Sequence, residues 1–167
     1  NQAVRTCKVK LSISEERKQD VLETFKQYNF AVNFYVDKAW GPRKKIVNKF
    51  KLQKLAYYPL EKEQGFKQIL CVLLAERLVT RLGFVLLTGV RKGKLLSPSF
   101  GPFSAIQFTK HTVTIKNREC TFSALGGRVK AKYVLGDYQK KILDDPDYEF
   151  RTGTLTFNGK DFSLIYL

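Results

Sequence analysis

The sequence predicts an α+β fold, in which a small OB-like antiparallel β-barrel is interrupted by an inserted lobe of three helices. Residues 4–13 alternate between apolar and polar as a strand does, whereas residues 14–83 carry apolar residues at helical spacing. The remainder is divided into short alternating segments separated by turn residues. Because one strand is not stable alone, the first strand should join the later ones. We therefore expect a discontinuous barrel of residues 1–13 and 84–167, and a helical lobe of residues 14–83.

The predicted elements of the first half follow from apolar spacing. Every second residue from Cys7 to Ile13 is apolar, and the pattern Ser12-Ile-Ser-Glu15 is typical of a capping box that begins a helix. This helix should end near Trp40, because a Gly-Pro pair follows it. A second helical pattern is expected to end at Pro59, and a third to cover about residues 61–82.

The second half of the chain carries turn signals between short strands. Turns are predicted at Asn117-Arg118, at Gly126-Gly127 and at Asn158-Gly159, the last of which is a strong hairpin signal. The predicted strands centre on Val113/Ile115, Cys120/Phe122, Val129/Ala131/Tyr133, Leu155/Phe157 and Phe162/Leu164/Tyr166, with one helical turn at Tyr138–Leu143.

The charge of the chain is its most informative property. Thirty Lys and Arg against fifteen Asp and Glu leave a formal net charge of +15. Such an excess usually indicates a polyanionic partner, and nucleic acid fits better than membrane because the cations are spread along the whole chain. An acidic protein partner and a merely soluble surface are the alternatives. No apolar run reaches membrane-spanning length, so no membrane partner is expected. Three buried thiols in a reducing compartment are consistent with the cytoplasmic location that we expect.

One predicted strand has a pattern suited to phosphates. Arg128, Lys130 and Lys132 alternate with apolar residues, so they should share one face at steps of about 7 Å. A solvated sheet face is the alternative, but such faces usually mix signs, and residues 77–136 contain a single acid, Glu119. The cations expected to contact nucleic-acid backbone are Lys8, Lys10, Arg43, Lys44, Lys45, Arg91, Lys92, Lys94, Arg128, Lys130 and Lys132.

Aromatic residues offer a second mode of binding, because bases stack on exposed rings. Most of the aromatic residues must belong to the core, and four that lie close to polar or turn-forming residues are the better stacking candidates. These are Tyr57, Tyr58, Phe103 and Phe108.

The sequence contains no recognisable catalytic or metal-binding pattern. Its three cysteines lie far apart, and His111 is the only histidine, so neither a zinc site nor a cofactor is expected. The acids of Asp144-Asp-Pro-Asp147 surround a proline and are typical of a solvated loop or a helix end.

Several short motifs resemble the transposon-encoded TnpB proteins, which are RNA-guided DNA nucleases related to type V CRISPR effectors. The motifs cover nearly the whole chain but each is loose. They are the opening Lys8-Val-Lys-Leu11 with a following Ser-Glu-Glu, the helix Phe25–Ala39 with Asn29 and Asn33, Pro98-Ser-Phe100, Ser104-Ala-Ile-Gln-Phe-Thr109, Val113-Thr-Ile115, Gly127-Arg-Val-Lys130, Gly136-Asp-Tyr-Gln139 and the hairpin Thr154–Tyr166.

The resemblance implies a wedge barrel interrupted by a helical recognition lobe, with guide RNA and target DNA as partners. The barrel would hold the guide-RNA scaffold, both parts would hold the guide–target heteroduplex, and residues at their junction would read a short flanking DNA motif. By position, the motif-reading residues would be Tyr57, Phe66, Lys67, Gln68, Ser104, Ile106, Gln107 and Phe108. Gln pairs well with adenine, and an apolar side chain such as that of Ile106 suits a thymine methyl.

In that family the RuvC nuclease domain follows the final hairpin, whereas this sequence stops at Leu167. The resemblance therefore implies that the nuclease carboxylates belong to a further part or to a second, RuvC-containing chain. Two other hypotheses remain open: a DNA-binding repressor that does not cleave, and a generic RNA-binding barrel protein without a guide.

Overall fold

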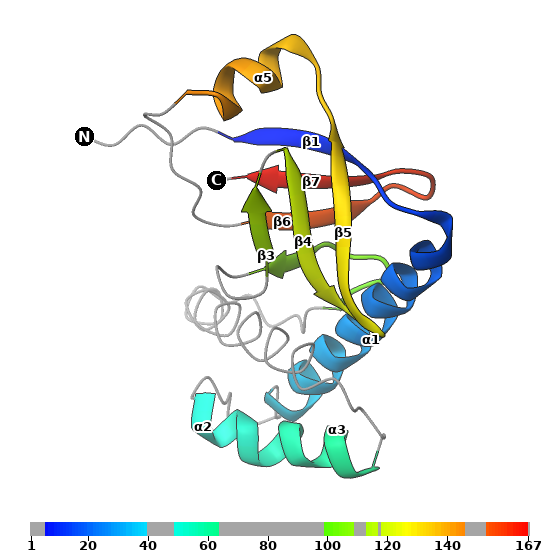
Figure 1. Cartoon of the computed structure of the whole chain (residues 1–167). Coiled ribbons are helices and arrows are strands. Elements are labelled where there is room, and N and C mark those ends of the chain that lie inside the picture. Colours follow the sequence, from blue (N-terminus) through cyan, green and yellow to red (C-terminus); the bar gives the residue numbers. More distant parts are fainter. Residues whose placement is uncertain are drawn as a thin grey trace, which may run out of the picture. The chain divides into compact units, whose positions relative to one another are not determined.

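A computed structural model describes residues 6–39, 49–63, 99–108, 113–116, 118–145 and 153–166 (Figure 1). The chain divides into two compact units, one of residues 1–25 with 103–167 and the other of residues 26–102. The described elements are β1 (Cys7–Ser12), α1 (Glu15–Ala39), α2 (Lys49–Leu52), η1 (Gln53–Tyr57), α3 (Tyr58–Glu63), β2 (Ile106–Phe108), β3 (Val113–Lys116), β4 (Glu119–Ala124), β5 (Gly127–Val134), α5 (Asp137–Leu143), β6 (Gly153–Phe157) and β7 (Phe162–Tyr166).

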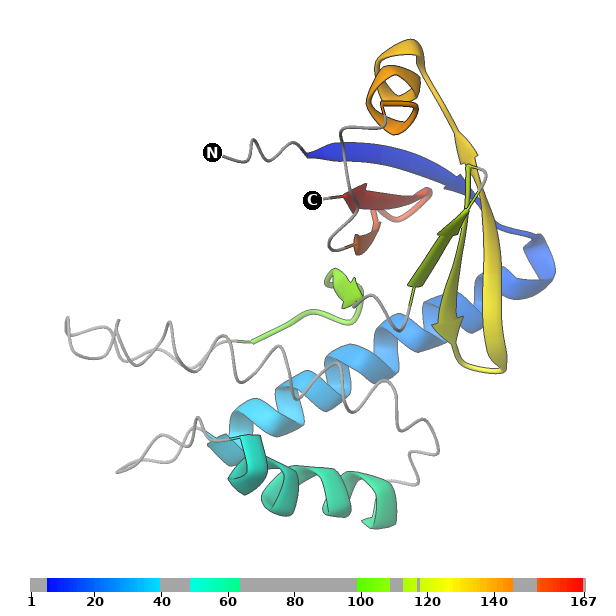
Figure 2. The same cartoon turned by 60° about the vertical axis from the view of Figure 1, so that its left-hand side comes forward.

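The first unit is built on an antiparallel sheet of seven strands in the order β2-β6-β7-β1-β5-β4-β3. The sheet curves into a nearly closed, barrel-like form (Figures 1 and 2). Strand β1 pairs with β5 on one side and with β7 on the other, so the first strand joins the later ones as predicted. The α+β class is therefore confirmed.

Alternation places the core on the inner face of this sheet. Val9, Cys120, Ala131, Leu155 and Leu164 are fully buried, and each lies between more exposed neighbours on its strand. Burying these apolar side chains on one face is the main force that holds the strands in this register, because a slip of one residue would turn all of them outward.

The predicted turns lie where the strands reverse. Arg118 adopts a φ of 59° before β4, and Gly126 and Gly127 have φ of 79° and 116° between β4 and β5. In the β6–β7 hairpin the side-chain oxygen of Asn158 accepts hydrogen bonds from the backbone N–H groups of Lys160 (3.0 Å) and Asp161 (2.7 Å). All three turn predictions are confirmed where the chain is described.

Helix α1 confirms the long first helix. It begins at Glu15, where the carbonyl of Ser14 accepts hydrogen bonds from the N–H groups of Arg17 (3.0 Å) and Lys18 (3.1 Å). Its Phe25 ring packs against Phe162 of β7 at 6.2 Å between ring centroids, within the first unit. Helix α5 confirms the predicted helical turn before residue 144.

The prediction that Pro59 ends a helix is wrong. The elements α2, η1 and α3 follow one another without a break from Lys49 to Glu63, and Pro59 is the second residue of α3 (Figure 2). Proline lacks an N–H group and crowds the carbonyl four residues earlier. The wider π-turn of η1, which directly precedes α3, accommodates both effects without ending the helix. Most of the predicted third helix, residues 64–82, lies outside the described residues.

Strand β2 is an element that the spacing of apolar residues did not reveal. It has only three residues, and it pairs with β6 through Ile106↔Leu155, Gln107↔Thr154 and Phe108↔Gly153. Three residues are too few for an alternation to stand out from a loop.

Candidate nucleic-acid interface

The outer surface of β5 and β1 gathers cations on one face. Along β5 the side chains of Arg128, Lys130 and Lys132 are exposed, whereas Val129 and Ala131 between them are buried. Along β1, Lys8 and Lys10 are exposed in the same alternating way. We call these five residues, Lys8, Lys10, Arg128, Lys130 and Lys132, the cationic face.

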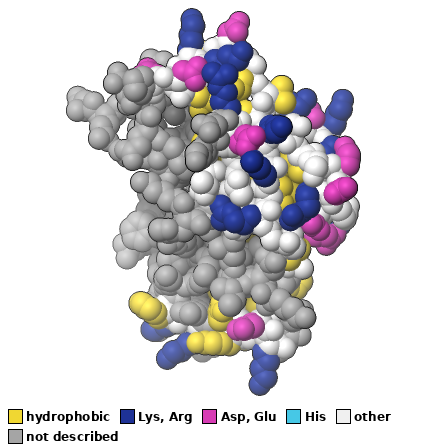
Figure 3. Space-filling view, in the orientation of Figure 1, with side chains coloured by type: hydrophobic (Ala, Val, Ile, Leu, Met, Phe, Trp, Pro, Cys, Tyr) yellow, Lys and Arg dark blue, Asp and Glu magenta, His cyan; other side chains and the backbone are white. Residues whose placement is uncertain are grey.

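Strand pairing shows that the lysines of β1 lie on the same side of the sheet, next to the end of the row of cations on β5. Lys10 lies opposite Val134, and Ser12 lies opposite Lys132, so the outward residues of β1 and β5 belong to the same side of the sheet. Figure 3 shows Lys and Arg side chains on the surface of this unit, with acidic side chains between some of them. The predicted sharing of one face by Arg128, Lys130 and Lys132 is therefore confirmed as geometry, and phosphate binding stays a prediction.

Arg128 is the most firmly held of these cations. Its guanidinium donates to the Thr114 hydroxyl at 3.1 Å, to the Thr121 carbonyl at 3.0 Å and to the Ser123 hydroxyl at 3.4 Å. These acceptors are neutral, so they orient the guanidinium and leave its positive charge uncompensated. A guanidinium fixed in this way loses little side-chain entropy when it binds a phosphate.

Two acidic side chains partly neutralise the positive charge of the cationic face. Glu119 forms an ion pair with Lys130 at 3.1 Å, and Asp161 forms one with Lys10 at 3.4 Å. Both lysines are more than half exposed, so each pair contributes little to stability. Within the described parts of the chain, the side chains of Lys8 and Lys132 have no ion-pair partner. The sequence did not reveal the ion pair of Glu119 with Lys130, because the two residues are eleven positions apart in the chain. The pairing of β4 with β5 brings them side by side.

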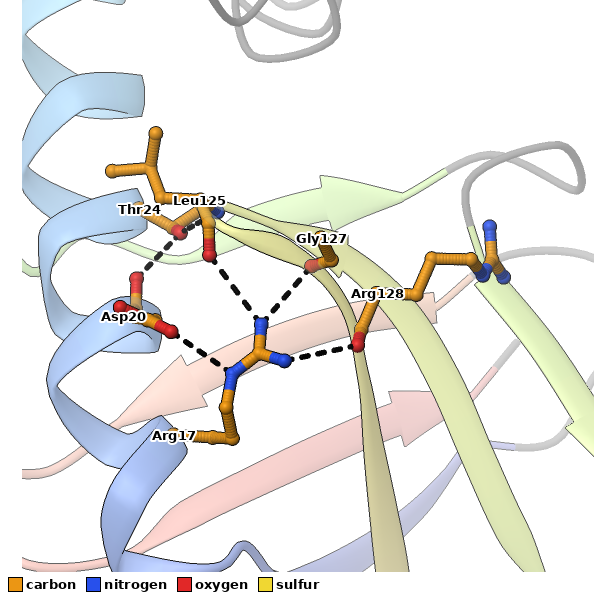
Figure 4. Close-up of polar contacts among 6 residues, drawn as sticks. All are labelled: Arg17, Asp20, Thr24, Leu125, Gly127 and Arg128. Carbon is orange, nitrogen blue, oxygen red and sulfur yellow. Dashed lines mark hydrogen bonds and ion pairs between the residues drawn. The ribbon is translucent and has the colours of Figure 1, made fainter.

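Helix α1 holds the turn that leads into β5 (Figure 4). The Arg17 guanidinium donates to three backbone carbonyls of this turn, those of Leu125 (3.4 Å), Gly127 (3.3 Å) and Arg128 (3.4 Å). Asp20 pairs with the Arg17 Nε at 2.9 Å and orients the guanidinium. We call Arg17 with Asp20 and Thr24 the turn anchor.

Thr24 completes the turn anchor from a buried position. Its hydroxyl donates to the Asp20 carbonyl at 2.7 Å and accepts from the Leu125 N–H at 2.9 Å. Gly126 between the anchored carbonyls has a φ of 79°, and a Cβ there would lie 3.2 Å from the Asp20 carboxylate. Both facts favour glycine at this position, which explains the Gly-Gly turn signal.

In the second unit, the next turns of α1 hold a different segment. The Asn33 amide donates to the Phe100 carbonyl at 2.8 Å, and its oxygen accepts from the Phe100 N–H at 2.9 Å. Asn29 is buried and donates to the Pro102 carbonyl at 3.2 Å. We call Asn29 and Asn33 the amide anchor. Two adjacent amides on one helix face thus fix the backbone of residues 100–102, a role that sequence spacing did not indicate.

The residues expected to read a flanking DNA motif differ in their exposure to solvent. Gln107 is exposed on β2, whereas Ile106 and Phe108 face the core with 1% and 2% of their surface exposed. The Phe108 ring packs against Phe122 at 5.5 Å. Ile106 and Phe108 are therefore core residues rather than the expected base contacts, because a base contact requires exposed atoms. Ser104 is partly exposed.

In the helical elements of the second unit, Tyr57 is partly exposed and meets the ring of Tyr58 edge-on at 5.2 Å. Burial raises the pKa of Tyr57, and the nearby Glu61 and Tyr58 raise it further. Tyr58 is exposed, as the prediction of a stacking residue requires. The remaining expected site residues lie outside the described residues: Arg43, Lys44, Lys45, Phe66, Lys67, Gln68, Arg91, Lys92 and Lys94.

The most exposed tyrosine of the described residues was not among the stacking candidates. Tyr138 in α5 is 60% exposed, and Val134 at the end of β5 is 53% exposed. The sequence placed Tyr138 correctly in a helical turn, but a single turn has too few residues to show which face is buried. The stacking candidate Phe103 is 38% exposed, and its ring meets that of Phe157 edge-on at 5.4 Å between centroids.

The described thiols are part of the core rather than a reactive site. Cys7 and Cys120 are both free and buried, and burial raises the pKa of Cys120 to about 12. Burial likewise raises the pKa of Tyr133, with Cys120 and Cys7 as further causes. Neither thiol forms the reactive thiolate at neutral pH. Among the residues that the structure describes, no group of His, Cys, Asp and Glu could hold a metal ion.

No helix in the described segments has both the length and the apolar character needed to cross a membrane. No protein-family model matches this chain, and no curated protein matches its sequence.

Proposed function

We propose that this chain is the nucleic-acid-binding part of a TnpB-like RNA-guided DNA endonuclease. In this proposal it binds a guide RNA, the heteroduplex of guide and target, and a short flanking DNA motif. The observation that carries the proposal is the cationic face, in which an oriented Arg128 and four lysines share one side of β5 and β1. The net charge of +15 supports a polyanionic partner in general.

The spacing of the cationic face favours a nucleic-acid backbone over other polyanions. Outward residues of one strand are separated by about 7 Å, which is close to the distance between successive phosphates of an extended strand. The resemblance adds the guide, the recognition lobe of three helices in residues 14–83, and the OB-like wedge as proposals. The exposed position of Gln107 on β2 supports its proposed contact with a base of the flanking motif.

Sequencing of the RNA that co-purifies with the chain, expressed beside its native locus, tests this function. One abundant RNA that overlaps the end of the gene is expected. A mixture of ribosomal and transfer RNA would instead favour the generic RNA-binding barrel protein. Footprinting on DNA with and without that RNA separates the guided protein from a repressor, because guided binding must follow the sequence of the RNA.

A further inference from the structure

The row of cations on β5 ends at an exposed apolar side chain, that of Val134. Val134 follows Lys132 at the same outward position of β5, and it lies directly opposite Lys10 of β1. Val134 keeps 53% of its surface exposed, so much of its apolar surface remains in water in the free protein. Its position is useful to a partner that is apolar at one point and anionic on either side.

Helix α5 brings Tyr138 to the same end of the sheet. It begins after Gly136, whose N–H donates to the side chain of Gln139 at 3.1 Å, and Gln139 reaches the Lys8 carbonyl at 3.5 Å. Figures 1 and 2 both show α5 at the end of β5, beside β1. Tyr138, in the first turn of α5, is 60% exposed, whereas Ile142 and Leu143 in its last turn are half-buried.

The chemistry of this surface suits an unpaired nucleotide. A base is an apolar disc that stacks on an aromatic ring or an aliphatic side chain, and the phosphates before and after it are anionic. In a duplex, by contrast, the bases are already stacked on each other and only the backbone is available to the cations. A ring at the end of a row of cations is therefore matched to the point where a paired segment becomes single-stranded.

Hydroxyl groups on the same face favour RNA. Ser12 lies opposite Lys132, and Ser163 lies opposite Lys10, so both are beside the lysines that would bind phosphate. A serine hydroxyl can donate to or accept from a ribose 2′-hydroxyl, which DNA lacks.

We infer that Tyr138 and Val134 form a stacking platform for an unpaired base of RNA, with Lys8, Lys10 and Lys132 binding the adjacent phosphates. This inference rests on the proposed function and deepens it, because it says which kind of RNA segment reaches this end of the cationic face. Tyr138 is the central residue of the platform.

The test uses the full chain and two fluorescent RNA hairpins of equal length. One carries a short unpaired 3′ tail containing 2-aminopurine, and the other is fully paired up to its loop. We expect Tyr138→Ala to weaken binding of the tailed hairpin about 10-fold and to abolish quenching of the 2-aminopurine. Binding of the paired hairpin should stay within about 2-fold. Tyr138→Phe keeps the ring and should behave as the unchanged protein does.

Phe50→Ala serves as the control, because Phe50 is exposed, belongs to the second unit and is not a stacking candidate, so its loss should change the binding of neither hairpin. An equal loss on both hairpins, or no loss on either, with Tyr138→Ala would overturn the stacking platform. A DNA tail that binds as tightly as the RNA tail would overturn the assignment to RNA. If the unchanged chain binds neither hairpin, the proposed function fails. If it binds both and only the Tyr138 effect is missing, the platform alone fails.

Discussion

The turn anchor and the amide anchor both hold backbone segments by hydrogen bonds, but these bonds differ in length and in exposure to solvent. In the turn anchor, a partly exposed guanidinium makes three contacts of 3.3 to 3.4 Å, supported by one buried hydroxyl. In the amide anchor, Asn33 makes two contacts of 2.8 and 2.9 Å that satisfy both polar groups of Phe100. Short, partly buried hydrogen bonds are costly to break, whereas long, solvated ones are replaced by water.

The two anchors also precede different candidate contacts with nucleic acid. The turn anchor holds the backbone at Arg128, where the row of cations on β5 begins. The amide anchor holds residues 100–102, a few residues before Gln107. Helix α1 therefore holds the backbone that precedes each of two predicted binding sites. Variants of each anchor should show separately its effect on stability and its effect on nucleic-acid binding.

The largest effect on RNA binding is expected from variants of β5, the strand that follows the turn anchor. Changing Arg128, Lys130 and Lys132 together to Ala should weaken RNA binding about 100-fold at about 0.1 M salt. The slope of log affinity against log salt should flatten by up to about three. Fluorescence titration at several salt concentrations measures both. Changing Lys18, Lys26 and Lys38 of α1 to Ala removes the same charge, and an equal loss there would contradict a specific role for the cationic face.

The amide anchor should give the largest loss of stability. Asn33→Ala leaves the N–H and the carbonyl of Phe100 without partners, which should lower the free energy of unfolding by about 2.5 kcal/mol. Urea denaturation followed by circular dichroism measures the change. Gln19→Ala, at an exposed position of the same helix, should cost less than about 0.5 kcal/mol. A similar cost for both would mean that the amide anchor is solvated.

The buried part of the turn anchor should come next. Thr24→Val has nearly the same shape but removes the acceptor of the Leu125 N–H, so we expect a loss of about 1.5 kcal/mol. Thr24→Ser keeps the hydroxyl and should lose clearly less in the same denaturation experiment. If serine and valine are equally destabilising, the methyl group rather than the hydrogen bond holds the turn.

The exposed part of the turn anchor should matter least. Arg17→Lys keeps the charge beside Asp20 but loses the fork that reaches three carbonyls, and we expect a cost of about 0.5 kcal/mol. RNA affinity should change less than about 2-fold, because the cations of β5 remain. A loss of stability above about 2 kcal/mol would show that the long contacts of the guanidinium are stronger than their geometry indicates.

Alternation and turn residues were sufficient to predict most of the sheet. The outward row of Arg128, Lys130 and Lys132 follows from a period of two, and the reversal at Gly126-Gly127 follows from the backbone freedom of glycine. The three-residue β2 and the passage of a helix through Pro59 were not predicted, because local patterns are weakest in short or irregular elements.

Local patterns in the chain were thus enough for the class of fold, for the face on which each strand residue lies and for the excess of positive charge. These properties depend on neighbours within a few residues, or on composition alone. The sequence did not reveal the ion pair of Glu119 with Lys130, the two anchors on α1, the position of Val134 opposite Lys10 or the exposure of Tyr138. They join residues that are far apart in sequence or whose exposure depends on packing, so only the folded register of the strands brings them together.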